Sequence, residues 1–273
     1  MLRDFVPPIA IKLARKVFPA HHDDGRPTYA TYEAALADCA ADGYEDRDLV
    51  EVVRRKTQAY RDALGSALLT PANASSLCAL LASIQSQEIH VLDFGGACGA
   101  HYFLARAVLP LSYTLRWTVV ETPAMAKAGV GLATEELTFS SDLRHAAESL
   151  GRIDLLHTSG TLQCVSDPRR SLGQLLDLRA TRILFNRLAL SQGPQDVVVV
   201  QQSKLSENGP GPMPGGLPDR TVRYPCTFLQ ESAFYDALRQ NHEVILTFED
   251  TSGVFRIKEQ PIIGRGLLAR RKT

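Results

Sequence analysis

The sequence lacks an excess of charge of either sign, because its 30 basic and 30 acidic residues cancel. A neutral chain is a poor partner for a phosphate backbone, so we expect no nucleic-acid ligand. It also lacks any run near the roughly 20 apolar residues that a membrane-spanning helix needs. What is present, 273 residues of which 45% are hydrophobic, is the composition of a globular protein with a sizeable core.

Cysteine is scarce and scattered, and no two cysteines form a CxxC pair. The sequence therefore predicts neither a disulfide framework nor a cysteine-based zinc site, and it favours a reducing compartment such as the cytoplasm. Adjacent histidines and aspartates at residues 21–24 lie in a polar stretch, where such residues are usually solvated, so we expect no metal ion. The five cysteines are Cys39, Cys78, Cys98, Cys164 and Cys226.

The first 20 residues do not match a signal peptide, because Lys12, Arg15 and Lys16 interrupt the apolar stretch. Residues 9–18 instead predict a short amphipathic helix with a basic face. We expect this helix to pack on the rest of the protein. The alternative is weak, reversible contact with the inner face of an anionic membrane, which leaves the predicted location cytoplasmic.

The remaining sequence divides into a helical extension, residues 1–85, and a second part, residues 86–273, in which strand and helix patterns alternate. Alternation of this kind predicts an α/β fold with a mostly parallel sheet and helices on both faces. Residues 207–225 are rich in glycine and proline and predict a loop, either a mobile cover over a site or a plain surface excursion. Strands are predicted at 89–94, 115–121, 137–139, 153–160, 181–190, 196–203, 243–250 and 264–271.

One stretch carries the main chemical signal: HVLDFGGACGAHYFLARAV, residues 90–108, in which an apolar run leads through three glycines into a helical pattern. Ligands of open α/β sheets bind beyond the carboxyl ends of the strands, and glycines there permit close backbone approach. The stretch lacks the Gly-Lys-Ser/Thr ending of a phosphate loop and the GxGxxG spacing of a dinucleotide site. Its pattern is Asp93, Gly95, Ala97, Gly99.

This pattern resembles the first motif of class I S-adenosylmethionine-dependent methyltransferases, Asp/Glu-x-Gly-x-Gly-x-Gly, with Ala97 in place of the middle glycine. Glu121 ends the next strand, where the family places an acid on the ribose hydroxyls. Asp142 matches the residue near the adenine, or else caps a helix, and residues 153–168 resemble the fourth-strand motif. The resemblance implies S-adenosylmethionine as cofactor, held by Asp93, Gly95, Gly96, Ala97, Gly99, Glu121, Asp142 and His157.

Further segments resemble one family of bacterial proteins regarded as methyltransferases, often encoded near genes for cell-surface polysaccharide. These segments include LRDFVPPI, HTSGTLQ, FNRLAL and YPCTFL, and the resemblance covers nearly the whole chain. It implies a Rossmann-like, seven-stranded sheet with one late strand antiparallel. The acceptor implied is an oxygen or nitrogen atom of a small or glycan-linked molecule.

The resemblance also suggests residues for the chemistry. His157 is the first candidate for a catalytic base, or else it lines the pocket or packs. Arg187, a second catalytic candidate, could hold an anionic acceptor, or else form an ion pair at a strand end. His101 could contact substrate or only begin a helix. The candidate substrate-binding residues are His101, Gln163, Arg187, Gln201 and Tyr224.

Two other functions stay open from the sequence. An NAD-dependent oxidoreductase would also place an acid at Glu121, although the dinucleotide spacing is absent. A non-catalytic protein that binds S-adenosylmethionine and serves as a partner subunit would explain Ala97 and the lack of an unambiguous base. The sequence does not predict the oligomeric state.

Overall fold

The computed structural model describes residues 25–39, 43–66 and 69–272. The amphipathic helix predicted at residues 9–18 and the histidine–aspartate stretch at 21–24 lie outside the described residues. No helix in the described ranges is long and apolar enough to cross a membrane.

The main sheet has seven strands in the order β4-β3-β2-β5-β6-β10-β9. Strands β2 to β6 are parallel to one another, and β10 runs antiparallel to both β6 and β9. The predicted α/β fold and its late antiparallel strand are therefore confirmed. The strands are β2 (Glu88–Phe94), β3 (Thr114–Val120), β4 (Leu137–Ser140), β5 (Leu155–Ser159), β6 (Arg182–Ser191), β9 (His242–Ile257) and β10 (Gln260–Arg271).

Alternate side chains of the central strands enter two separate hydrophobic cores, because neighbouring residues of a strand point to opposite faces. Val91 belongs to the core on one face, whereas Leu92 belongs to the core on the other. Both faces are covered, which explains the nearly continuous apolar runs in these strands. The first face carries α3 (Arg47–Asp62), α4 (Pro71–Ser83), α5 (Ala100–Val108) and α6 (Pro123–Gly129), and the second carries α7 (Leu143–Leu150), α8 (Pro168–Asp177) and α9 (Glu231–Asn241).

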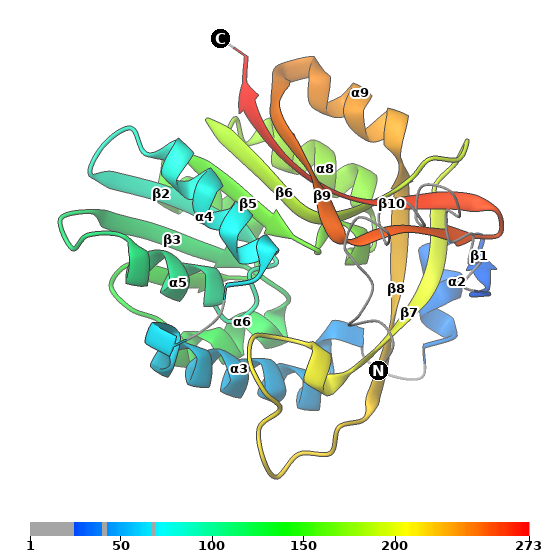
Figure 1. The fold of residues 1–273 in the computed structure, drawn as a ribbon, viewed down its shortest axis with the longest axis horizontal. Helices are drawn as coiled ribbons and strands as arrows, with labels where there is room; N and C mark the ends of the chain where they lie inside the picture. Colours follow the sequence, from blue (N-terminus) through cyan, green and yellow to red (C-terminus); the bar gives the residue numbers. More distant parts are fainter. Residues whose placement is uncertain (1–24, 40–42, 67–68, 273) are drawn as a thin grey trace, which may run out of the picture.

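A second, antiparallel sheet stands beside the main one (Figure 1) and was not predicted. It consists of β1 (Thr28–Tyr29), β7 (Val197–Lys204) and β8 (Thr221–Gln230), with the short helix α2 (Tyr32–Ala37) packed against it. Only two residue pairs, Leu190 with Leu229 and Ser191 with Gln230, join β8 to β6. The total of ten described strands therefore exceeds the seven that we expected.

Strand β8 overlaps the segment 207–225 that we predicted as a loop, so that prediction was wrong from Thr221 onward. The glycine- and proline-rich start of this segment is followed by a strand that pairs with β7 from Thr221 to Phe228. The pairing tolerates Pro225, which lacks a backbone donor, and it buries Cys226 and Phe228. Pairing with β7 thus outweighs the local glycine and proline content, which by itself predicts a loop.

The connection between β7 and β8 is fastened at its base and lies against α3 (yellow in Figure 1). The Ser206 amide and hydroxyl donate to the two carboxylate oxygens of Asp219, at 2.9 and 2.8 Å. Lys56 on α3 donates from Nζ to the Ser206 carbonyl at 2.7 Å. Arg220 forms ion pairs with Asp46 and Asp48 at the start of α3. Residues 207–218 therefore form an arc between two fixed ends.

Candidate functional site

A cavity of about 620 Å³, here called the larger cavity, opens at the carboxyl ends of the parallel strands. The chain proceeds from β2 to β3 and β4 on one side and then returns to β5 on the other side of β2. This reversal of strand order is where open α/β sheets bind ligands. The turn after β2, residues 95–99, and the turn after β5, residues 159–161, meet there.

Glycine is required in the turn after β2 for reasons of packing. Gly95 has a φ of 75°, and a Cβ atom on it would lie 2.0 Å from Oγ1 of Thr161 in the turn after β5. A Cβ on Gly96 would lie 2.3 Å from Oδ2 of Asp93. Gly99, with a φ of 85°, stands at the start of α5. The turn after β2 and the turn after β5 are therefore in contact, with no room between Gly95 and Thr161 for an added side-chain atom.

Ala97 occupies the position of the missing middle glycine and adopts the left-handed conformation with a φ of 51°. Its amide donates to Oε1 of Glu121 at 2.9 Å, and the Thr122 amide donates to Oε2 at 2.9 Å. Burial raises the pKa of Glu121, against the effect of these two amides. The carboxylate thus lines the larger cavity at the end of β3, where we predicted a ligand-binding acid.

A smaller cavity of about 320 Å³ adjoins the larger one, and both are lined by Gly95, Ala97, Ser159 and Arg187. Arg187 lies within β6 with a φ of 52°, which departs from the regular strand, and its side chain is exposed. Among the residues that the structure describes, its guanidinium forms no ion pair. An unpaired cation between two cavities is suited to hold an anionic group.

The structure gives Asp93 and His157 a place that differs from the one we predicted. Both side chains are 1% exposed, and neither lines a cavity. His157 Nδ1 donates to Asp93 Oδ1 at 2.7 Å, and its Nε2 lies 2.8 Å from the Ser76 hydroxyl on α4. Because both ring nitrogens have partners and the ring is sealed from the cavities, this geometry does not support His157 as a catalytic base or either residue as a cofactor contact.

His101, for which we considered either contact with a ligand or a role in starting a helix, lies on the first turn of α5 and lines the smaller cavity. Its ring lies against that of His157, with centroids 4.4 Å apart. Its Nδ1 is buried, lies 3.4 Å from Asp93 Oδ2, and makes no hydrogen bond.

Three predicted site residues lie away from the cavities and have structural partners. Asp142 caps α7 by accepting from the His145 amide at 2.9 Å, the alternative that we had kept open. Gln163 donates to the Arg187 carbonyl at 3.1 Å, and so fixes the backbone of Arg187. Gln201 accepts from the Cys226 thiol at 3.3 Å.

Tyr224 does line the larger cavity, with a partner that the sequence did not suggest. Its ring packs on Tyr44, with centroids 4.5 Å apart, and burial raises the pKa of both hydroxyls. Cys164 completes this wall. Tyr44 was missed because it lies about 180 residues from Tyr224 in sequence and belongs to no motif.

Residues 207 and 209 line both cavities, so the arc 207–218 covers the site at one end. Gly209 approaches α3, where a Cβ on it would lie 3.4 Å from the Val53 Cα. This agrees with one of the two interpretations of the glycine- and proline-rich segment, a cover over a site.

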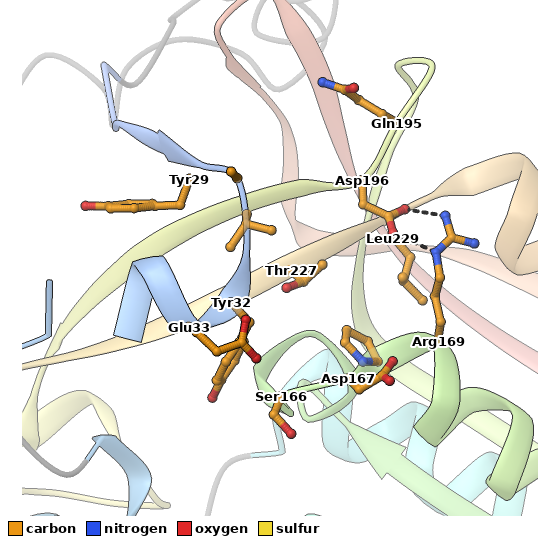
Figure 2. A pocket seen from close by; sticks show the side chains of 13 residues that line it. Tyr29, Tyr32, Glu33, Ser166, Asp167, Arg169, Gln195, Asp196, Thr227 and Leu229 are labelled. Atoms are coloured by element: carbon orange, nitrogen blue, oxygen red, sulfur yellow. Dashed lines mark hydrogen bonds and ion pairs between the residues drawn. The ribbon is translucent and has the colours of Figure 1, made fainter. Parts of the chain in front are cut away.

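A third cavity of about 460 Å³ lies beyond Tyr32 and Ser166, which it shares with the larger cavity. Two of the acidic side chains that line this cavity, drawn in Figure 2, have structural partners. Asp196 forms a bidentate pair with Arg169 at 2.7 Å, and Asp167 caps α8. We therefore take the two cavities at the glycine turn as the candidate site.

No protein-family model matches the chain, and no curated protein matches it in sequence. Several solved structures are similar to it. One is an S-adenosylmethionine-dependent methyltransferase from Clostridium acetobutylicum, 8% identical, with a TM-score of 0.47 over 79% of this chain and 97% of that one. Another is 1,6-didemethyltoxoflavin-N1-methyltransferase from Burkholderia thailandensis, 13% identical, with a TM-score of 0.45 over 93% of this chain and 98% of that one.

A third similar structure is a sugar N-methyltransferase from Streptoalloteichus, 14% identical, with a TM-score of 0.46 over 79% of this chain and 92% of that one. Identities and TM-scores this low say nothing about what the present chain binds. The description of the fold rests on its own strand order, and the description of the site rests on its own residues.

Proposed function

We propose that the chain is an S-adenosylmethionine-dependent methyltransferase that acts on an oxygen or nitrogen atom of a small or glycan-linked acceptor. The observation that carries the proposal is the position of Glu121. Its carboxylate stands at the end of β3, beside the turn after β2, and lines a cavity at the reversal of strand order. Of the motif residues that suggested this cofactor, Gly95, Ala97 and Glu121 line this cavity, and we take this as support for the proposal.

Glu121 is suited to a neutral, hydroxyl-bearing ligand. Each carboxylate oxygen accepts one backbone amide and keeps a lone pair for a ribose hydroxyl. No lysine is among the described residues that line the larger cavity, and the turn after β2 lacks the Gly-Lys-Ser/Thr sequence of a phosphate loop. The arginine that does line it, Arg187, is assigned to the acceptor below. This lining favours a sulfonium cofactor over a nucleotide. We assign the cofactor to the larger cavity on this basis, with Gly95 and Ala97 as its backbone floor.

The acceptor is assigned to the region around Arg187, where the two cavities meet. We infer that it carries a carboxylate, phosphate or other anionic group, because Arg187 offers a planar pair of donors for such a group. The preference for a glycan-linked acceptor, and a role in cell-surface polysaccharide synthesis, rest on the sequence resemblance alone.

Catalysis by this site would depend mainly on how well the site aligns the acceptor atom with the methyl group. No histidine is among the described residues that line the larger cavity. Burial raises the pKa of Tyr32 to about 12, so its hydroxyl is a poor base at neutral pH. Methyl transfer is an in-line displacement at the methyl carbon, in which the bond to the acceptor forms as the bond to sulfur breaks. Correct alignment of the acceptor and the methyl group can supply about 7–11 kcal/mol of the barrier reduction. The site therefore favours an acceptor that is nucleophilic without a strong base.

The first test is calorimetric titration of the full chain with S-adenosylmethionine, S-adenosylhomocysteine and NAD. We expect the first two to bind with micromolar dissociation constants and NAD to give no heat. Binding of NAD with no response to the other two would support the oxidoreductase alternative and overturn the proposal. Binding without turnover in a broad acceptor screen would support the non-catalytic alternative.

Arg187→Gln tests the acceptor assignment, with Arg179→Gln as a matched control at a described residue that lines neither cavity. We expect Arg187→Gln to raise the KM for an anionic acceptor by at least about tenfold, which corresponds to about 1.4 kcal/mol, while cofactor affinity stays unchanged. An equal loss of cofactor affinity would place Arg187 on the cofactor instead.

A further inference from the structure

Two histidines flank one buried carboxylate beneath the glycine turn. Asp93 and His157 are register partners on the neighbouring parallel strands β2 and β5, so their side chains leave the sheet side by side. His101 reaches the same point from the first turn of α5. One potential ligand atom from each residue lies within 4.8 Å of the other two. Parallel pairing and the tight turn thus assemble the cluster from three separate elements.

The hydrogen bonds present leave the cluster incomplete. Asp93 is fully buried, and among the described residues its hydrogen-bond donors are His157 and the Trp117 indole N–H, which lies 3.3 Å from Oδ2. The buried His101 Nδ1 lies 3.4 Å from the same oxygen, a long contact that does not form a well-aligned hydrogen bond. A cation bound between this nitrogen and the buried carboxylate would replace the long contact with two direct ligand bonds.

The outer contacts suit a metal ligand. The Ser76 hydroxyl lies 2.8 Å from His157 Nε2, and the Asn186 amide donates to the same hydroxyl at 3.3 Å. A histidine that ligates through one nitrogen is commonly held by such a contact at the other, which fixes the orientation of the ring. His157 is thus oriented with its Nδ1 toward the carboxylate.

One side of the cluster is open. His101 lines the smaller cavity together with Tyr60, Asn73 and Gly96. That cavity, of about 320 Å³, has room for the water molecules or ligand atoms that would complete a coordination sphere. Two imidazoles and one carboxylate, with an open side, are a ligand set that borderline divalent metals such as Zn²⁺ and Fe²⁺ prefer.

We propose that Asp93, His101 and His157 bind one divalent transition-metal ion, with its remaining coordination positions directed at the smaller cavity. The ion takes the place of the His157 proton on Nδ1, and that proton moves to Nε2, which then donates to the Ser76 hydroxyl, so His157 binds as a neutral imidazole. The proposal departs from the sequence-based expectation of no metal ion, because the three residues are brought together by strand pairing and by the turn into α5. The proposal does not depend on the methyltransferase function.

The test is titration of the chelator-treated full chain with Zn²⁺, followed by Co²⁺ as a spectroscopic probe. We expect one high-affinity Zn²⁺ site that His101→Asn weakens by at least about tenfold. His145→Asn, at an exposed histidine of α7, is the matched control and leaves the affinity unchanged. A combined His21→Ala and His22→Ala variant tests the adjacent histidines as a competing site.

The absorption spectrum of the Co²⁺ form distinguishes nitrogen and oxygen ligands from thiolates, and Cys78→Ser removes the exposed cysteine as a competitor. His157→Asn, which could disturb folding, is used only if its circular dichroism matches that of the unaltered chain. Absence of a site tighter than about 100 µM would overturn the proposal. Loss of binding in the His21/His22 variant, or unchanged affinity in His101→Asn, would do the same.

Discussion

The carboxylate of Glu121 accepts a hydrogen bond from the Ala97 amide at 2.9 Å, so the residue that follows β3 also holds the turn that follows β2. One side chain therefore shapes the floor of the larger cavity and lines its wall. A substitution there changes both the turn and any contact with a ligand. The two effects can be separated, because glutamine keeps an acceptor oxygen and alanine keeps none.

We expect Glu121→Gln to weaken S-adenosylmethionine binding by roughly 10–100-fold, because a neutral amide replaces a charged acceptor of ribose hydroxyls. Glu121→Ala should weaken it further and also lower the melting temperature, because the Ala97 amide loses its partner. Calorimetry and thermal unfolding measure the two effects. Equal cofactor affinity in all three proteins would remove Glu121 from the site.

Cofactor binding should weaken as the pH falls. Burial raises the pKa of Glu121, and only the ionised form accepts two ribose hydroxyls while holding both amides. The loss of affinity should therefore begin at a higher pH than an ordinary glutamate would give. Glu121→Gln should bind weakly with little dependence on pH. Titrations between pH 5 and pH 8 check this, and a pH dependence that survives in the variant would contradict it.

Gly95→Ala should destabilise the fold by more than about 2 kcal/mol. The new Cβ would overlap Thr161, and the left-handed backbone with a φ of 75° disfavours any residue that has a Cβ. Gly131→Ala is the matched control, because nothing lies within 4 Å of its Cβ position. Urea unfolding of the two variants should separate them clearly. Similar stability for both would show that the two turns are not in close contact.

The ion pair between Asp46 and Arg220 should make part of the stability depend on pH. Burial raises the pKa of Asp46, but hydrogen bonds from Arg220 and the amides of Leu49 and Asp48 outweigh burial and bring it below its usual value. The stabilisation is therefore complete above the unfolded-state pKa of about 3.9 and is lost as pH falls through the lower folded-state pKa.

Asp46→Asn keeps a good helix cap but loses the charge, so the variant should be less stable than the unaltered chain at pH 7. The two should converge as the pH falls below the lowered folded-state pKa of Asp46. Unfolding by urea at several pH values measures the difference. A constant difference across this range would show that the charge of Asp46 does not contribute.

Periodicity predicted the main sheet well, because the buried strands read as short apolar runs separated by helices and turns. It failed at β8, where glycine and proline precede a strand that depends on pairing with a distant β7. Asp93 and His157 were misplaced for a related reason. Their position in the strands is visible in the sequence, but their burial depends on the helices that cover the sheet. Ser76 on α4, which lies 2.8 Å from His157 Nε2, carries no local sign of that contact.

Glu121 and Arg187 were predictable, because each follows or interrupts an apolar run at the edge where ligands bind. The ring contact between Tyr44 and Tyr224 and the buried Nδ1 of His101 could not be predicted, because both depend on how distant segments pack. The residue type at a strand end thus predicts which edge of the sheet a side chain lies at. Whether that side chain is buried or lines a cavity depends on how the surrounding helices pack.

The closed base of the β7–β8 connection has a consequence for how ligands enter and leave. Ser206 is tied to both Asp219 and Lys56, and the Glu207 and Asn208 side chains bond to the backbone of Lys204. The base of the connection therefore stays fixed in any movement of residues 210–218. We expect the rates at which ligands enter and leave the two cavities to depend on these loop residues more than on the sheet, so chains that differ only there would share their site residues and differ in ligand residence time.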